Sequence, residues 1–263
     1  MPARAKSYVF YIGDWAILTG PTFVESPFYR EIKDTDIHFY GQRLVDALEP
    51  KADVTAMSAW KLYHLEPGGF EKILRRSSAI IVSDVEAHCF SLYPAFFDRA
   101  KRQRYVQTFP DRLVNLRKWV KAGGGLVMLG GWLSFSGANE RGGWRRSPIA
   151  EVLPVECLLG DDLVDSSAGF TADVVLPDHA LAKGLPWRSF PPIFGYNQLV
   201  PKDGAEVVVR VKETGHPLVV VGKYGKGRIA IYASDPAPHW GINFELWSGY
   251  DKFWQQMLRW VGR

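Results

Sequence analysis

The first half of the chain alternates between short apolar runs and segments with helical periodicity. A segment over 111–122 places Leu113, Leu116 and Val120 on one face behind Asp111, a residue type that caps helices. A Gly-rich stretch at 123–125 ends this predicted helix. Alternating strands and helices predict an α/β fold, a parallel sheet with helices on both faces. The strands are expected at 7–14, 52–60, 79–85 and 125–129, with further helices at 36–48 and 67–77.

The second half has a different character. Residues 148–201 are rich in Pro, Asp and Gly, which predicts loops and a small added sheet. Three apolar runs over 205–235, separated by turn signals at 214–215 and 223–228, predict antiparallel hairpins. The chain closes with a helix whose apolar face must bury against the sheet. We therefore expect one domain over 1–263, with its core at about 7–137 plus 203–263 and a β-rich elaboration at about 145–202.

Composition narrows the class of protein. The chain of 263 residues is 47% hydrophobic and 23% charged, as in an ordinary globular protein. Two widely separated cysteines, Cys89 and Cys157, suggest a reducing compartment, and we expect a cytoplasmic location. The basic N-terminal segment runs into an apolar stretch that Gly13 and Asp14 interrupt, which we interpret as an arm leading into a strand rather than a signal peptide.

The sequence also bears on partners. No apolar run approaches 18 residues, so no membrane span is expected. The net charge of +4 could favour an anionic partner, but no nucleic-acid motif accompanies the short basic clusters, and we expect no nucleic acid. With neither paired histidines at i, i+4 nor a C-x-x-C motif, no metal or cofactor is expected. The sequence leaves a homo-oligomer as one alternative.

Ligands of open α/β sheets bind at the carboxyl ends of strands. That rule selects the loops at 13–15, 83–89, 130–137 and 235–240. Paired glycines in the third loop allow a tight turn, and their free N–H groups could hold a ligand oxygen. The alternative is a turn that needs no side chains. The candidate ligand-binding residues in these loops are Asp14, Trp15, Asp84, Gly130, Gly131, Trp132, Asp235 and Trp240.

Three residues are candidates for catalysis. His239 follows a strand end among prolines, where a histidine can act as a general base or simply bond a loop carbonyl. Cys89, beside a histidine and two acids, could form a thiolate pair or be a small buried hydrophobe. Ser134 is a nucleophile type in the Gly-rich loop, but an unassisted serine hydroxyl is a poor nucleophile.

Seven segments of the sequence together carry a family resemblance. They are SDVEAHCF, PDRLVNLRKWVKAGGGLVMLGGWLSFSG, SPIAEVLPVE, DHALAKGLP, FGYNQLVPKDGAEVVVRV, GKYGKGRIAIYASDPAPHWG and WSGYDKFWQQMLRWV. These segments resemble the class I glutamine amidotransferase-like family, which is related more distantly to the ThuA-like proteins. The resemblance covers most of the chain from about residue 7, and it implies a flavodoxin-like sheet core with a decorated C-terminal half.

The resemblance also shows where this chain departs from the family's catalytic pattern. Active members place a Cys in a G-x-C-x-G elbow and a His and Glu in a later H-x-E motif. Here Trp132 stands where the Cys would be, and Ser134 replaces the second Gly. His239 is retained, but Gly241 replaces the Glu. Losing triad members leaves little catalysis, so glutamine hydrolysis by the usual route is not expected.

Three hypotheses follow. In the first, the protein binds a small polar or anionic ligand, such as a sugar or a nucleoside, without glutaminase activity. The Gly131 N–H would receive a ligand oxygen, Asp84 and Asp235 would accept hydroxyl hydrogen bonds, and the tryptophans would stack. In the second, it is a hydrolase with a relocated nucleophile, Cys89 or Ser134, and His239 as base. In the third, the aromatic C-terminal helix pairs subunits.

Overall fold

The computed structural model describes residues 6–18, 23–26, 29–32, 36–97 and 108–262. Within them, eight strands form one sheet in the order β11-β14-β15-β16-β8-β7-β1-β6. Five adjacent strands in this sheet run parallel to one another, which confirms the α/β class. They are β1 (Ser7–Gly13), β6 (Ala52–Met57), β7 (Ala79–Ser83), β8 (Gly125–Leu129) and β16 (Gly227–Tyr232).

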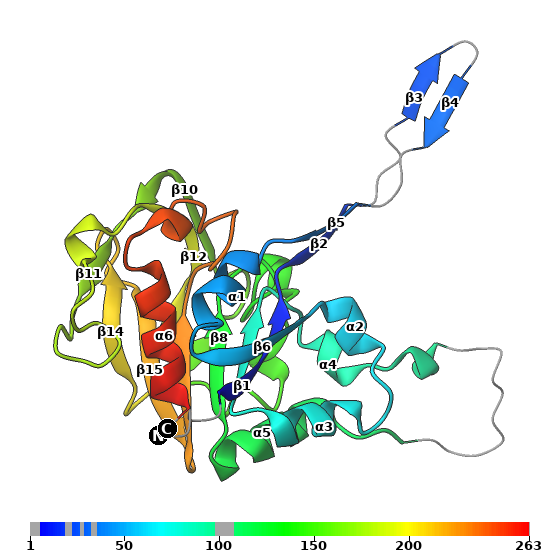
Figure 1. Cartoon of the computed structure of the whole chain (residues 1–263), viewed down its shortest axis with the longest axis horizontal. Coiled ribbons are helices and arrows are strands. Elements are labelled where there is room, and N and C mark those ends of the chain that lie inside the picture. The colour runs from blue at the N-terminus through cyan, green and yellow to red at the C-terminus, as the bar shows by residue number, and fades with distance from the viewer. Residues whose placement is uncertain (1–5, 19–22, 27–28, 33–35, 98–107, 263) are drawn as a thin grey trace.

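The parallel strands have the flavodoxin-like order. Numbered along the chain as 1 to 5, they stand as 2-1-3-4-5, so the winding direction reverses between β1 and β7. Helix α1 packs against α6, and α3 packs against α5, so helices cover both faces of the sheet (Figure 1). The α-helices are α1 (Gln42–Leu48), α2 (Ala59–Tyr63), α3 (Gly69–Arg76), α4 (His88–Ser91), α5 (Arg112–Ala122) and α6 (Tyr250–Val261).

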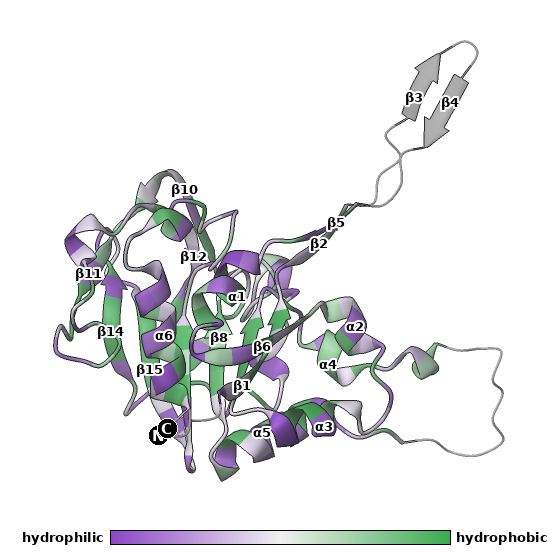
Figure 2. Ribbon diagram, viewed as in Figure 1, coloured by the Kyte–Doolittle hydropathy of each residue, from purple (hydrophilic) through white to green (hydrophobic). Residues whose placement is uncertain are grey.

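Burial on both faces explains the composition of the central strands. All five residues of β7 and of β8 are buried, and Figure 2 shows the inner strands mostly in the green of hydrophobic residues. Helix α5 begins where expected, because the Asp111 carboxylate accepts a hydrogen bond from the Val114 N–H at 2.9 Å. It ends at Gly123, whose φ of 127° is one that side chains rarely adopt.

The register aligns the carboxyl ends of four strands. Gly13 pairs with Ser83, Ser83 with Leu129, and Leu129 with Tyr232. The chain leaves the sheet at the same edge after each of these residues. Side chains that directly follow these strand ends are therefore brought together, whatever their separation in sequence.

An antiparallel extension continues the sheet beyond β16. Strands β14 (Glu206–Val211), β15 (Pro217–Tyr224) and β16 form the two predicted hairpins. From the elaboration, β11 (Ala172–Val174) adds to the sheet edge beside β14. The rest of the elaboration forms two small ladders rather than one sheet. These pair β9 (Val155–Cys157) with β13 (Leu199–Pro201), and β10 (Leu163–Phe170) with β12 (Ile193–Asn197).

Several local predictions need correction. The helix expected at 36–48 is the strand β5 (Asp36–Phe39) followed by α1, because β5 pairs with β2 (Trp15–Leu18). The strand expected to reach residue 60 stops at Met57. A further hairpin, β3 (Phe23–Ser26) with β4 (Tyr29–Ile32), has no sequence prediction. Short 3₁₀ helices span Pro94–Phe96, Ala138–Glu140, Trp144–Arg146, Trp187–Ser189 and Phe244–Leu246.

The aromatic face of α6 is buried within its own chain. Tyr250, Phe253 and Trp254 are each at most 1% exposed and pack with Tyr232 of β16 and Phe244. This confirms that the face packs on the sheet. The third hypothesis, pairing of subunits through this helix, relied on these aromatic side chains, which do not lie at the surface.

Candidate functional site

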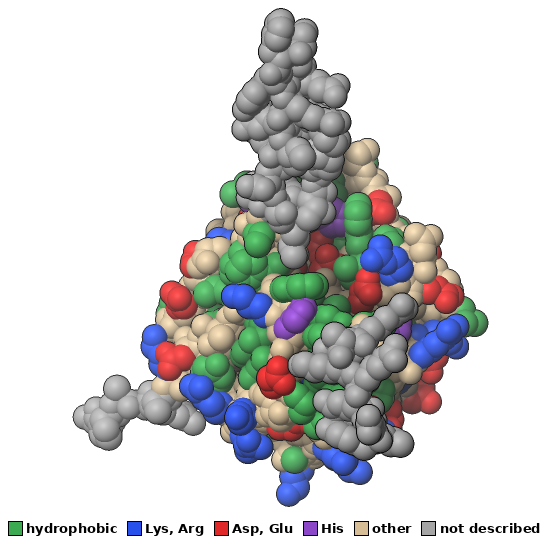
Figure 3. Space-filling view, turned by 90° about the vertical axis from the view of Figure 1, so that its right-hand side faces the viewer, with side chains coloured by type: hydrophobic (Ala, Val, Ile, Leu, Met, Phe, Trp, Pro, Cys, Tyr) green, Lys and Arg blue, Asp and Glu red, His purple; other side chains and the backbone are tan. Residues whose placement is uncertain are grey.

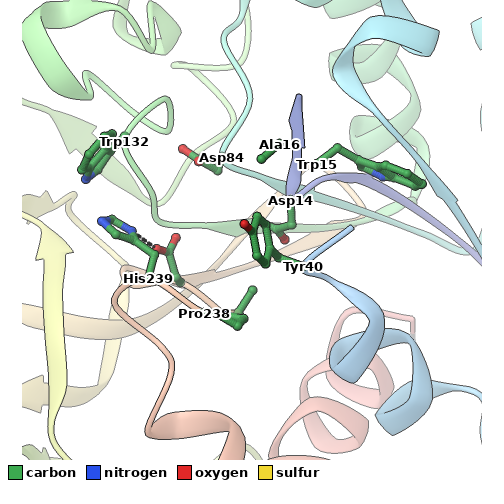
Figure 4. Close-up of a pocket in the computed structure, with 10 residues that line it drawn as sticks. Asp14, Trp15, Ala16, Tyr40, Asp84, Trp132, Pro238 and His239 are labelled. Carbon is green, nitrogen blue, oxygen red and sulfur yellow. Dashed lines mark hydrogen bonds and ion pairs between the residues drawn. The ribbon is translucent and has the colours of Figure 1, made fainter. Parts of the chain in front are cut away.

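A pocket of about 190 Å³ opens at the aligned strand ends. Its walls come from the segments after β1, β7, β8 and β16, and from Tyr40 after β5. Six of the ten lining residues are among the candidate site residues that were predicted from the sequence. The lining residues are Asp14, Trp15, Ala16, Tyr40, Asp84, Trp132, Asp235, Ala237, Pro238 and His239 (Figure 4).

Asp14 lies directly after β1. Its carboxylate accepts hydrogen bonds from the Tyr11 hydroxyl and from Ser83 Oγ, the latter at 2.9 Å. Burial raises the pKa of this carboxyl well above its usual range, and the charges of Asp235 and Asp84 raise it further. Two hydroxyl donors thus orient a carboxyl group that still resists ionisation.

Asp84 occupies the matching position after β7. Its Oδ1 accepts a hydrogen bond from the Leu133 N–H at 2.6 Å, and its own N–H donates to Ser134 Oγ at 3.1 Å. Burial, followed by the charge of Asp235, raises the pKa of Asp84 to about 7. This carboxyl therefore changes charge near neutral pH.

Asp235 and His239 form a close pair after β16. His239 Nδ1 lies 2.5 Å from Asp235 Oδ2, as the dashed line in Figure 4 marks. Asp235 is 4% exposed, and its second oxygen, Oδ1, is buried without a hydrogen-bond partner. Burial raises the pKa of Asp235. Burial disfavours the charged form of His239, but the bond to Asp235 and the nearby carboxylates outweigh it and raise the pKa of the imidazole.

Aromatic rings border these polar groups. The Trp132 side chain is 52% exposed, and its ring meets the His239 ring edge to face at a centroid distance of 4.8 Å. Farther along the pocket, Trp15 stacks on Phe39 at 4.5 Å, and its Nε1 is buried without a partner. Figure 4 shows Trp132 and His239 on one side and Trp15 on the other, with Asp84 and Asp14 between them.

Three lining residues hold uncommon backbone conformations. Asp14 has φ 54°, Asp84 has φ 49° and His239 has φ 124°. The values of 54° and 49° lie in the left-handed region that aspartate tolerates, whereas 124° at His239 lies outside it and is uncommon for any residue but glycine. Such strain concentrates at binding and catalytic sites, where the surrounding structure enforces it.

The elaboration fixes the loop after β8. Asn197 of β12 is fully buried, and its Oδ1 accepts from the Gly131 N–H at 2.9 Å while its Nδ2 donates to the Gly131 carbonyl at 3.1 Å. Asp162 accepts from Asn197 and from the N–H groups of Ser136 and Gly137. The Gly131 N–H, which the first hypothesis assigned to a ligand oxygen, therefore donates to Asn197 instead. No pattern in the sequence identified Asn197 or Asp162.

Some candidate residues lie outside the pocket. Gly130 and Gly131 are buried, and a Cβ on Gly131 would come within 2.6 Å of Asp84 Oδ1. Trp240 is buried, donates from Nε1 to Asp165, and stacks on the His239 ring. Ser134 is buried, and Cys89 packs against the hydrophobic core. Neither Ser134 nor Cys89 lines the pocket.

Among the described residues, no group of three His, Cys, Asp or Glu side chains is arranged to hold a metal ion. The pocket walls contain three carboxyl groups and one imidazole, but no Lys or Arg within the part of the chain that the structure describes. Figure 3 views this face, where acidic side chains lie in a hollow beside hydrophobic and histidine side chains. The site is acidic although the whole chain is basic.

A family model described as "Putative glutamine amidotransferase" matches residues 28–263. The chain belongs to this family. The cytoplasmic protein STM3548 of Salmonella typhimurium is 30% identical to it, with a TM-score of 0.84 over 97% of this chain and 98% of that one. The cytoplasmic protein STM1381 of Salmonella typhimurium LT2 is 29% identical, with a TM-score of 0.84 over 97% and 100% of the two chains.

A structure of much lower sequence identity shares the fold. A ThuA-like protein from Bacteroides uniformis superposes with a TM-score of 0.52 at 13% identity, covering 99% of this chain and 95% of its own. No curated protein sequence matches this family member. None of its described helices is long and apolar enough to cross a membrane.

Proposed function

We propose that this glutamine amidotransferase-like protein binds a small polar ligand in the pocket at the strand ends and does not hydrolyse glutamine. The observation that carries the proposal is the contact between Trp132 and His239. By the family resemblance, Trp132 stands at the elbow position of the nucleophilic Cys. An indole there has no atom that can attack a carbonyl carbon, and it occupies the space beside the imidazole.

The pocket walls suit recognition of hydrogen-bond donors. Asp14, Asp84 and Asp235 present carboxyl oxygens from the ends of three strands of one sheet, β1, β7 and β16. Trp132 and Tyr40 add aromatic surface at the exposed rim, where a flat apolar face of a ligand can stack. A few convergent polar groups between aromatic walls are typical of small-molecule sites. The acidity of the pocket argues against the anionic ligand considered from the net charge.

The alternative, a hydrolase with a relocated nucleophile, has less support. Burial raises the pKa of the Cys89 thiol to about 11, with a further contribution from Glu86, so little thiolate exists at neutral pH. The Ser134 hydroxyl accepts the Asp84 N–H and is buried away from the pocket. His239 directs one ring nitrogen to Asp235 and makes a T-shaped contact with Trp132, and neither partner is the Cys89 or Ser134 that this alternative requires.

The proposal places the protein in the cytoplasm. Its support is the similarity to two Salmonella proteins described as cytoplasmic. The two free thiols, one half-buried and one buried, fit that location.

A thermal-shift screen of monosaccharides, nucleosides, amino acids and small amines tests the proposal. Binding to the folded state raises the midpoint of unfolding, because it stabilises that state by RT ln(1 + L/Kd), where L is the free ligand concentration. We expect at least one class to stabilise the wild type and to lose that effect in Asp235→Asn. Asp173→Asn, on the edge strand β11, is the matched control and should respond like the wild type. A screen with no stabilising class overturns the proposal.

A further inference from the structure

The charge balance of the pocket points to a more specific ligand. Three carboxyl groups, Asp14, Asp84 and Asp235, line one cavity, and each raises the energy of ionising another. The compensating charge among the described lining residues is the His239 imidazole, which is bonded to Asp235 alone. The pocket therefore holds more potential negative charge than positive charge.

Asp235 supplies an independent sign of a missing partner. It is 4% exposed, and only its Oδ2 is hydrogen-bonded, by the His239 ring and weakly by the Trp240 N–H at 3.4 Å. Its Oδ1 is buried with no partner. A buried polar atom left unpaired costs free energy, and native structures pair almost all such atoms. Asp235, which lines the pocket, therefore has one carboxyl oxygen without a hydrogen-bond donor.

Two arginines of the described chain are engaged with other carboxylates. Arg43 forms an ion pair with Asp251 at 2.5 Å and stacks over the Tyr250 ring. Arg141 pairs with Glu86 at 2.8 Å. Glu245, whose charge also reaches Asp14, adds to the negative side. Within the described part of the chain, no lysine or arginine neutralises the pocket.

The next inference rests on the proposed function. We propose that the ligand of this pocket carries a positively charged amine. The amine lies among Asp14, Asp84 and Asp235, and the apolar part of the ligand lies against Trp132 and Tyr40. A cation relieves the repulsion among the carboxylates, which a neutral sugar or nucleoside does not. Charge-assisted hydrogen bonds to carboxylates are about twice as strong as neutral ones. Aromatic faces at the rim attract cations as well as apolar groups.

Matched probes of the same shape test this inference. Benzylamine is compared with benzyl alcohol, and cyclohexylamine with cyclohexanol, by isothermal titration at pH 7. We expect each amine to bind on the order of tenfold or more tightly than its alcohol. Asp235→Asn should reduce this preference, and the control Asp173→Asn should keep it. Equal or tighter binding of the alcohols overturns the inference.

Proton release gives a second readout that needs no variant. A bound cation favours the ionised form of Asp84, whose pKa of about 7 already reflects the charges of Asp235 and His239. Amine binding at pH 7 should therefore release protons, up to about half a proton from Asp84 alone. Titration in phosphate and in HEPES, which differ in ionisation enthalpy, measures this number. Amine binding without proton release contradicts the inference.

The two proposals fail in different ways. If a neutral sugar or nucleoside stabilises the wild type but not Asp235→Asn, while neither amine is preferred, the cationic ligand is wrong and the binding function stands. If no compound of the screen and neither amine binds, both are wrong.

Discussion

The rings of Trp132 and His239 meet edge to face at 4.8 Å, although 107 positions separate them in the sequence. The pairing of β8 with β16 causes this contact, because Leu129 and Tyr232 lie side by side at the ends of parallel strands. In an active member of the family, a thiol and an imidazole are expected at these positions. Under our proposal, the Trp132 indole takes the place of that thiol beside the imidazole.

The raised pKa of Asp84 predicts a pH-dependent stability. In the unfolded chain this carboxyl ionises near pH 3.8, but in the folded protein it keeps its proton to about pH 7. The unfolded state thus binds fewer protons across this window, and the free energy of unfolding falls as pH rises. This contribution to stability is fully present below about pH 4 and is lost above about pH 7.

Asp84→Asn should remove this loss of folding stability between about pH 4 and pH 7. Asparagine keeps the acceptor for the Leu133 N–H but cannot ionise. Each pKa unit corresponds to about 1.4 kcal/mol, so we expect the variant to gain roughly 2–4 kcal/mol over the wild type at pH 8 and little at pH 4. Urea unfolding at both pH values measures this. An equal effect at the two pH values would show that Asp84 does not titrate differently on folding.

Gly131→Ala should displace the Asp84 side chain. The φ of 142° at Gly131 disfavours any side chain, and the added Cβ would come within 2.7 Å of the Asp84 carboxyl carbon. We expect a loss of ~2–4 kcal/mol from strain and overpacking together. Gly204→Ala is the matched control, with φ 80° and open space around the new Cβ, and should lose only about 1 kcal/mol. Equal losses would argue against close packing at the elbow.

Asn197→Ala should loosen the loop after β8. The substitution leaves the buried Gly131 N–H without an acceptor and removes a donor to Asp162. Such unpaired buried groups cost about 1–3 kcal/mol each. Chemical unfolding measures the loss, and hydrogen exchange should show faster exchange at Gly131. Asn243→Ala, which removes one bond at a half-buried position, is the control. Unchanged exchange at Gly131 would contradict an anchoring role.

Cys89 should react slowly with iodoacetamide at pH 7. Its thiol has a pKa of about 11 and packs against the core, so the reactive thiolate is scarce. Mass spectrometry of the intact protein follows the alkylation, with free cysteine as the reference thiol. Rapid labelling that His239→Ala abolishes would instead revive the relocated nucleophile.

The sequence predicted the parts of this structure that depend on strong periodicity. The strands at 79–83 and 125–129 and the helix at 112–122 follow from continuous apolar runs and a clear cap. The strand-end rule then selected Asp14, Asp84 and His239 correctly as neighbours, because the aligned register brings strand ends together. Local pattern and general topology were sufficient for these residues.

Other features depended on contacts that leave no local signal. Tyr40 reaches the pocket because β5 pairs with β2, a pairing that helical spacing over 36–48 obscured. Asn197 and Asp162 act on Gly131 and its loop from distant segments, and nothing in their surroundings distinguishes them from ordinary turn residues. The use of the Gly131 N–H likewise depends on the fold of the elaboration. Only coordinates could show these contacts.

The central claim is that the site binds a ligand and does not cleave glutamine. Incubating the protein with isotopically labelled glutamine and measuring labelled glutamate by mass spectrometry tests it most directly. The account predicts no glutamate beyond that formed in buffer, with wild type and His239→Ala indistinguishable. Glutamate formation by the wild type that His239→Ala abolishes would contradict it.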